Sequence, residues 1–125
     1  MSTEKQCACA TAPKLVFPCS GASDVGEITD RAARQLTKRG KGRMYCLAGI
    51  GGHIPDMIEN TKKAAKILVI DGCPQDCARK TMDQGGFSKF EYLRLSDMGL
   101  EKGKTLPDHE NISKVVAKGA QILEC

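Results

Sequence analysis

A short apolar segment followed by a segment with helical spacing occurs four times along this chain. The third apolar segment, Ile67-Leu68-Val69-Ile70, is half β-branched, which is typical of a strand covered on both faces at the centre of a sheet. A β-α order repeated four times requires right-handed crossovers between parallel strands, with helices on both faces. The sequence therefore predicts an α/β fold: a three-layer α/β/α sandwich with a mainly parallel four-stranded sheet of Rossmann-like βα repeats. The predicted strands are residues 14–18, 43–47, 67–70 and 90–95.

Helix signals follow each predicted strand. Each of these segments has apolar residues at helical spacing, and a capping pair or a proline marks its start. The glycine-rich residues 48–53 are expected to form a loop that carries His53. The predicted helices begin near Asp24, at Pro55, at Pro74 and after Pro107.

The length of 125 residues fits one domain whose core is large enough to fold without a metal or a disulfide. We assign residues 14–125 to a single α/β domain and residues 1–13 to a flexible tail that carries a C-x-C pair, Cys7 and Cys9. The apolar runs are far shorter than the roughly 18 residues of a membrane span, and the N-terminus lacks the apolar core of a secretory signal. We therefore expect a cytoplasmic protein with no membrane partner.

The net charge of +4 raises the possibility of a nucleic-acid partner. The basic residues, however, gather at predicted helix ends, where positive charge favours the helix dipole. The chain has three Phe, two Tyr and no Trp, which leaves little aromatic surface on which bases could stack. We expect no nucleic-acid partner, and the sequence indicates no surface for a protein partner.

Seven cysteines in a reducing compartment point to metal ligands or catalytic thiols rather than to disulfides. Cys19 and Cys73 follow the first and third predicted strands, Cys46 ends the second, and Cys77 comes four residues after Cys73. Parallel strands end on one edge of the sheet, and open α/β sheets bind ligands at that edge. We therefore expect these four thiols to converge there.

The segment Asp71-Gly72-Cys73-Pro74-Gln75-Asp76-Cys77 has its own chemistry. If Pro74 is the first helical residue, Cys73 lies at or beside the N-cap and Cys77 lies one turn further on the same face. Free amides at a helix start stabilise thiolates, and two such thiolates hold a soft cation. Two more thiolates complete a tetrahedron, so the predicted partner is a metal ion. Zinc is the expected metal and an iron–sulfur cluster the alternative, with the ligands Cys19, Cys46, Cys73 and Cys77.

Four other residues are candidates for a supporting role around the metal. Ser20 and Ser23 lie in the small-residue loop after the first strand and are possible hydrogen-bond donors to the ligands. This loop is similar to a phosphate cradle, but a phosphatase would have Arg where Val25 stands. Asp71 either orients a ligand or caps the turn before Cys73. His53 is either a ligand or proton carrier near the site or an exposed loop residue.

Three ordered motifs then resemble a known family. They are "PCSG" at Pro18–Gly21, "CLAGIG" at Cys46–Gly51 and "IDGCPQDCARK" at Ile70–Lys80. Together they look like the DGC-domain family of zinc-binding proteins, which is named for its Asp-Gly-Cys motif. The resemblance extends from about Leu15 into the last helix. It implies a zinc site formed by the same four cysteines, and it implies no particular reaction.

The sequence leaves open whether the protein is an enzyme. The main alternative is a thiol/disulfide redox or sulfur-transfer enzyme in which Cys73 and Cys77 react. A zinc hydrolase with His53 or Asp71 as its base is conceivable if one metal position stays open for water. A metal-dependent interaction module is the third class.

Overall fold

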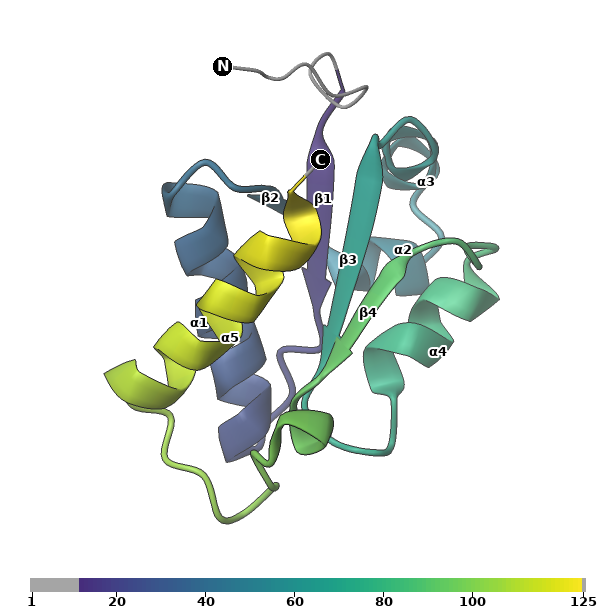
Figure 1. Ribbon diagram of the computed structural model, residues 1–125. Coiled ribbons are helices and arrows are strands. Elements are labelled where there is room, and N and C mark those ends of the chain that lie inside the picture. The colour runs from purple at the N-terminus through teal and green to yellow at the C-terminus, as the bar shows by residue number, and fades with distance from the viewer. Residues whose placement is uncertain (1–11, 125) are drawn as a thin grey trace.

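The computed structural model describes residues 12–124, and its ribbon is shown in Figure 1. The predicted N-terminal tail with Cys7 and Cys9 lies almost entirely outside these residues, as does Cys125. In the described part of the chain, no helix combines the length and the apolar character needed to cross a membrane.

Four parallel strands form one sheet, as the sequence predicts. Their order is β2-β1-β3-β4, so β1 and β3 are central and β2 and β4 are the edges. β1 and β3 pair over five residues, with Leu15 beside Ile67 and Phe17 beside Val69. The strands are β1 (Lys14–Pro18), β2 (Arg43–Met44), β3 (Lys66–Asp71) and β4 (Glu91–Arg94).

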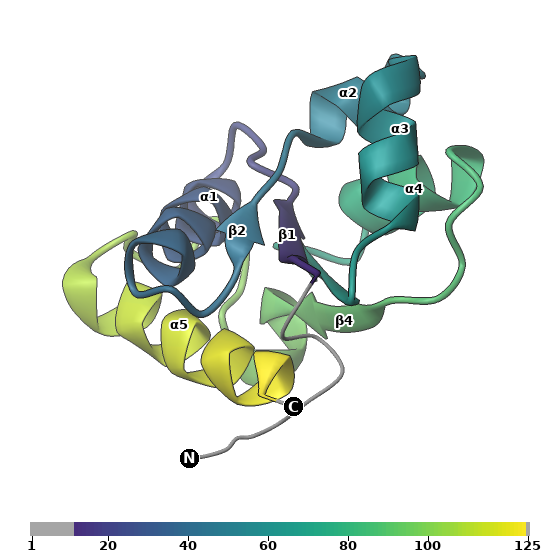
Figure 2. The ribbon, with the colours of Figure 1, turned by 90° about the horizontal axis from the view of Figure 1, so that it is seen from above.

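Helices cover both faces of this sheet. α1 (Asp24–Lys38) and α5 (His109–Leu123) pack side by side on one face. The other face is covered by α2 (Leu47–Gly51), α3 (Pro55–Lys62) and α4 (Cys77–Gln84). A short 3₁₀ helix, η2 (Leu95–Met98), follows β4. Figure 2 shows the three layers, which confirms the predicted α/β/α architecture.

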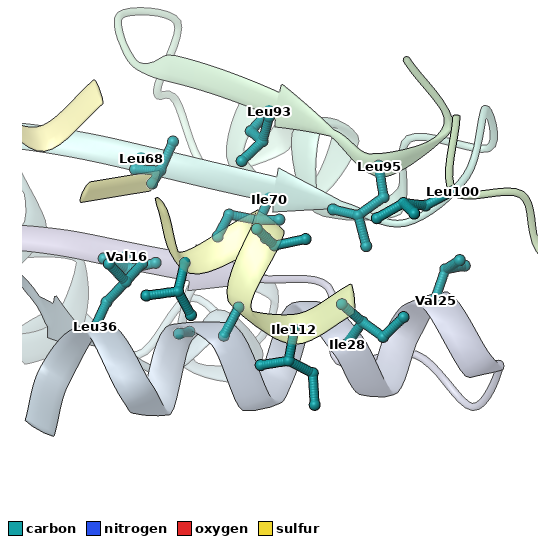
Figure 3. Packing of buried hydrophobic residues seen from close by; sticks show 14 of the residues in the cluster. Val16, Val25, Ile28, Leu36, Leu68, Ile70, Leu93, Leu95, Leu100 and Ile112 are labelled. Carbon is teal, nitrogen blue, oxygen red and sulfur yellow. The ribbon is translucent and has the colours of Figure 1, made fainter. Parts of the chain in front are cut away.

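Alternating strand residues build one hydrophobic core on each face. Val16, Leu68 and Ile70 point toward α1 and α5, where they meet Ile28 and Leu36 as Figure 3 shows. Neighbouring positions point the other way, toward α2 and α4, so that each central strand is buried on both faces. The residues of this second core include Leu15, Phe17, Val69, Ile50, Ala78 and Met82.

The segment after β2 differs from the prediction. The second strand was expected at residues 43–47, but the ladder with β1 covers only Arg43 and Met44. The glycine-rich residues expected to form a loop begin with the short helix α2, and Cys46 is its N-cap. Glycine at position 49 permits this turn to pack against α3, because a Cβ there would lie 1.9 Å from Met57 Sδ. A helical turn of this kind depends on tertiary contact and has no local sequence signal.

The amino ends of β1 and β3 are attached to the carboxyl end of α5. Lys66 Nζ donates to the carbonyl oxygens of Ile122 at 3.0 Å and Glu124 at 2.9 Å, and Lys14 Nζ donates to that of Leu123. Cationic groups at a helix C-terminus satisfy its last carbonyls and stabilise its dipole. The sheet is thereby anchored at the amino ends of its central strands, opposite to their carboxyl ends (Figure 1).

Candidate functional site

The strand order places a topological switch point between β1 and β3. From β1 the chain crosses to β2 on one side, and from β3 it crosses to β4 on the other side. Crevices at such points are the usual ligand sites of open α/β sheets. Cys19 directly follows β1, where its amide donates to Ile70 O at 2.8 Å, and Cys73 comes two residues after β3. Two of the predicted ligands therefore lie at the switch point.

A cavity of about 430 Å³ opens at this point. Three of the four predicted ligands, Cys19, Cys73 and Cys77, line it. The fourth, Cys46, lies instead in an adjoining depression, which Cys19 also borders. The remaining lining residues of the first cavity are Gly21, Ala22, Ser23, Val25, Asp71, Gly72, Gln75 and Lys102.

The four thiols are free, and their exposure differs. Cys19 and Cys73 are half-buried, whereas Cys46 and Cys77 are exposed. Within residues 12–124, no group of three or more His, Cys, Asp or Glu side chains is arranged to hold a metal ion. Thiols are nevertheless the type of ligand that a metal such as zinc prefers. Ligation by all four would require Cys46, the N-cap of α2, and Cys77, the first residue of α4, to come closer to Cys19 and Cys73.

Two glycines allow the walls of the cavity to come together. A Cβ on Gly26, in the first turn of α1, would lie 2.3 Å from Gly21 O. A Cβ on Gly72 would lie 2.8 Å from Val25 Cγ2. Real Cβ atoms do not approach other atoms so closely, so both positions require glycine. The loop after Cys19, the start of α1 and the end of β3 are therefore in direct backbone contact.

Thr29 contacts the Cys19 loop, and the sequence does not identify it as a site residue. Its side chain is fully buried. Its hydroxyl donates to Gly26 O at 2.7 Å and accepts from Ser20 N at 3.1 Å. The same oxygen lies 3.5 Å from Cys19 Sγ. Thr29 adjoins the apolar stripe of α1, and a hydroxyl beside an otherwise apolar stripe is the signal that could have revealed it.

The two predicted serines are engaged in the loop itself. Ser20 adopts a left-handed backbone with φ of 51°, and its hydroxyl donates to Asp30 Oδ1 at 2.7 Å. Ser23 is the N-cap of α1, and its hydroxyl accepts from Gly26 N at 3.1 Å. His53 is exposed in the turn after α2, outside the linings of both cavities.

Asp71 caps α4 from the end of β3. Its carboxylate is 2% exposed and accepts from Ala78 N at 2.8 Å and Arg79 N at 3.0 Å. The prediction that Pro74 opens this helix is wrong: α4 begins at Cys77, with Asp76 in the N-cap position. A cap supplied from seven residues upstream explains the later start. Cys73 and Cys77 therefore do not share a helical face, although they line one cavity.

A second set of contacts holds the exit of the cysteine loop. The Tyr92 hydroxyl lies 2.7 Å from Asp71 Oδ2 and 2.9 Å from Asp76 Oδ1, so it joins two carboxylates that bracket residues 72–75. Arg94 Nη1 donates to Asp76 Oδ1 at 2.9 Å. We call Asp71, Asp76, Tyr92 and Arg94 the loop clamp. Tyr92 and Arg94 lie outside every sequence motif. The one sequence signal that could have linked them is their spacing of two residues, which places both on the same side of the edge strand β4.

The charges in the loop clamp are mutually stabilised. Burial works against the carboxylate of Asp76, but hydrogen bonds from Tyr92 and Arg94 and the nearby guanidinium groups keep its pKa lowered. Burial and the two carboxylates raise the pKa of Tyr92, so its hydroxyl keeps its proton. Asp76 has φ of 57°, an uncommon backbone conformation that these contacts hold in place.

A turn after η2 is fastened over the start of α1. Asp24 Oδ1 accepts from Gly103 N at 2.9 Å, and Asp24 Oδ2 accepts from Thr105 N at 3.2 Å. The Gly103 hydrogen bond is the main cause of a lowered pKa at Asp24; burial opposes it, and Thr105 and Val25 amides reinforce it. The turn carries Lys102 to the rim of the cavity.

Asp24→Asn is expected to lower the free energy of unfolding by on the order of 1 kcal/mol at pH 7. Because the folded pKa of Asp24 is lowered, its contribution is complete above the ordinary value of 3.8 and is lost as the pH falls through the folded value. Urea titrations at pH 7 and pH 3 should therefore show a difference from the native protein that shrinks in acid. The control is Asp56→Asn, at an exposed position in α3. An equal difference at both pH values would contradict this role.

A family model described as DGC domain matches residues 15–118. The chain belongs to the DGC-domain family. It is also similar to the Anaerobic and virulence modulator AnvM of Pseudomonas aeruginosa, with 33% identity over 88 residues, 70% of this chain and 67% of AnvM. The family resemblance found in the sequence is thus confirmed. No solved structure matches the chain.

The Asp-Gly-Cys motif of this DGC domain has a distinct structural role at each position. Asp71 caps α4 and binds Tyr92, Gly72 permits contact with Val25, and Cys73 lines the cavity. The first two residues therefore fix the place of the third. The geometry of the motif is thus set by the two residues before Cys73.

Proposed function

We propose that this DGC-domain protein binds one zinc ion through the thiolates of Cys19, Cys46, Cys73 and Cys77. The observation that carries the proposal is the shared cavity of three of these cysteines at the switch point, with the fourth in the adjoining depression. Thiolates are preferred zinc ligands, and four of them make a closed tetrahedral site.

The mobility expected of two ligands supports this proposal. Cys46 caps a helix of five residues and Cys77 begins one of eight, and both thiols are exposed. Short surface helices open and shift at low cost in free energy, so these two thiols can approach the more buried Cys19 and Cys73. Bound zinc would supply the positive charge that keeps all four sulfurs ionised.

The capping of α4 also favours a metal over free reactive thiols. A cysteine at a helix start usually owes its low pKa to free backbone amides. Here Asp71 already occupies the amides of Ala78 and Arg79 and places a negative charge beside them. These amides are therefore not free to stabilise a negative sulfur at Cys77, whereas a bound metal ion would contact the sulfur directly.

The relative AnvM is described as an anaerobic and virulence modulator. By analogy with that description, we propose that the metal site of this chain serves regulation rather than catalysis of a reaction. Such a role suits thiolate ligation, because oxygen and oxidants attack cysteine sulfur and release the metal.

A second candidate is a thiol/disulfide redox or sulfur-transfer enzyme that uses Cys73 and Cys77. The observation that favours it is that both thiols line one cavity and that Cys77 is exposed. In this alternative the two cysteines alternate between the dithiol and a disulfide, or one of them carries sulfur as a persulfide.

Metal content separates the two candidates. Elemental mass spectrometry of protein purified without chelator or affinity-tag metal is expected to find one zinc per chain. Serine at any of the four cysteines should lower zinc affinity at least tenfold, because a tetrahedral thiolate site loses one of its four ligands. Serine at Cys7, outside the set of four, is the matched control and should keep the metal.

An iron–sulfur cluster would appear in the same measurement as iron and acid-labile sulfide. Metal-free native protein whose Cys73 and Cys77 form a disulfide on mild oxidation would overturn the zinc proposal and favour the redox candidate. Equal zinc loss in the Cys7 control would show that no specific set of ligands exists.

A further inference from the structure

Two hollows open beside the amino ends of the strands. One of about 270 Å³ adjoins the starts of β1 and β2, and one of about 440 Å³ adjoins the start of β3. Within residues 12–124, no Asp or Glu lines either hollow. Every charged residue in their linings is basic, and we call this set the basic edge: Lys14, Lys41 and Arg43 in the smaller hollow, and Lys62, Lys66 and Lys89 in the larger.

The parallel topology gathers the basic edge on one side of the sheet. Each crossover returns the chain to the amino end of the next strand, so the connections after α1, α3 and α4 lie there together (Figure 1). Lys14 on β1 and Lys66 on β3 are direct register partners on strands about 4.8 Å apart. Lys14 lines one hollow and Lys66 the other, so the positive charge continues across the two central strands.

The outer members of the basic edge lack acidic partners. Lys41, Arg43 and Lys89 are exposed, and none of them forms an ion pair with another residue in the described part of the chain. Lys62 pairs with Glu59 at 3.2 Å, but both side chains are largely exposed, and such pairs contribute little. These charges are therefore available to a binding partner.

Lys14 reports the excess of positive charge at the centre of this edge. Burial and the nearby ammonium group of Lys66 lower its pKa, and Lys41 adds to the effect. Glu124 opposes these influences but does not overcome them. An anionic group placed here would relieve the repulsion among the ammonium groups.

The larger hollow combines this charge with apolar residues. Ala64, Ala65, Ile67 and Phe87 line it together with the three lysines. An apolar side chain flanked by carboxylates fits such a lining, because it gains burial and charge complementarity together. Nucleic-acid bases gain less, since Phe87 is only 9% exposed and offers little of its ring for stacking.

We propose that the basic edge binds an acidic segment of a partner protein. The carboxylates of this segment contact Lys41, Arg43 and Lys89, and an apolar side chain between them enters the larger hollow. Neither hollow shares a lining residue with the cysteine cavity, so the proposal does not depend on a bound metal. The interaction weakens as salt concentration rises, because exposed charges are screened.

Fluorescence anisotropy with the full chain tests the proposal. A labelled peptide of repeated Glu-Glu-Leu is expected to bind saturably, at least tenfold more tightly than Gln-Gln-Leu or Glu-Glu-Ser peptides of the same length. The double variant Lys41→Glu, Lys89→Glu should weaken binding at least tenfold, because it reverses two exposed charges of the basic edge. Lys102→Glu, Lys104→Glu is the control with the same net charge, on the turn at the rim of the cysteine cavity, and should bind as the native chain does.

Equal weakening in the two double variants would show a response to net charge alone and would overturn the proposal. Equal binding of the Glu-Glu-Ser peptide would overturn the part assigned to the larger hollow. Duplex DNA is the competing polyanion. If DNA binds more tightly than the acidic peptide, with the same dependence on Lys41 and Lys89, the edge serves nucleic acid and the protein partner is wrong. Absence of saturable binding to the peptide would also overturn the proposal, and urea titrations verify that both variants fold.

Discussion

Gly26→Ala is expected to destabilise the protein by about 3 kcal/mol and to displace the loop that carries Cys19. Alanine at a helical position is usually better than glycine by about 1 kcal/mol. Here the added Cβ would lie 2.3 Å from the oxygen and 2.6 Å from the carbon of the Gly21 carbonyl. Backbone atoms cannot move aside as a flexible side chain can, so the cost of overpacking exceeds the gain in helix propensity. Urea denaturation measures the loss of stability.

A matched variant separates the steric effect from the general effect of alanine. Gly51→Ala places its Cβ no closer than 3.4 Å to Thr81 Cγ2, an ordinary contact, so we expect a change below about 0.5 kcal/mol. Zinc affinity should fall at least tenfold in the Gly26 variant and stay unchanged in the Gly51 variant. If the Gly26 variant is as stable as the native protein, the close contact between α1 and the Cys19 loop does not exist in solution.

Tyr92→Phe is expected to lower the free energy of unfolding by about 2 kcal/mol. The change removes one hydroxyl that lies within hydrogen-bond distance of Asp71 and Asp76, and leaves the buried carboxylate of Asp71 with its two amide donors only. The ring remains, so the contact of the Arg79 guanidinium with its face, 5.3 Å from the centroid, is kept. The variant therefore isolates the hydroxyl. Chemical denaturation and a zinc titration of the same sample measure its two effects.

Tyr45→Phe serves as the control for this experiment. The Tyr45 hydroxyl accepts from Asn60 Nδ2 at 3.0 Å in an exposed contact, and its ring packs edge-on against Phe17. Loss of that hydroxyl should cost less than about 0.5 kcal/mol and leave zinc affinity unchanged. We expect the Tyr92 variant, in contrast, to bind zinc more weakly because the loop between Cys73 and Cys77 loses its fixed exit. Equal effects of the two variants would show that the loop clamp does not position the cysteines.

The layered fold could be predicted because its signals are local. The continuous apolar run of β3 and the repeated β-α order determine the parallel sheet and its two covered faces. The start of α4 could not be predicted in this way. Pro74 is a sound local signal for a helix start, but Asp71 supplies the actual cap across seven residues, and Asp76 takes a left-handed backbone to permit it. Periodicity contains no information about such a contact.

In the candidate site, too, some features have local sequence signals and others depend on tertiary contacts. The position of cysteines after predicted strands indicates one shared edge, and the structure places Cys19, Cys73 and Cys77 in one cavity. The supporting residues Thr29 and Tyr92 could not be found, because their roles depend on which side chains the folded chain brings to the loop. Whether the four thiols hold zinc stays a prediction, which the metal measurement decides.

The lysine contacts at the far end of the sheet separate the support of the two central strands from the cysteines. Lys14 and Lys66 attach the amino ends of the two central strands to the last carbonyls of α5, and none of these groups borders the cysteine cavity. The anchor and the chemistry thus occupy opposite ends of the same two strands. Substitutions of exposed side chains at the rim of the cavity leave this anchor untouched. The rim of the cavity can therefore be redesigned for another ligand while the strand anchor is kept.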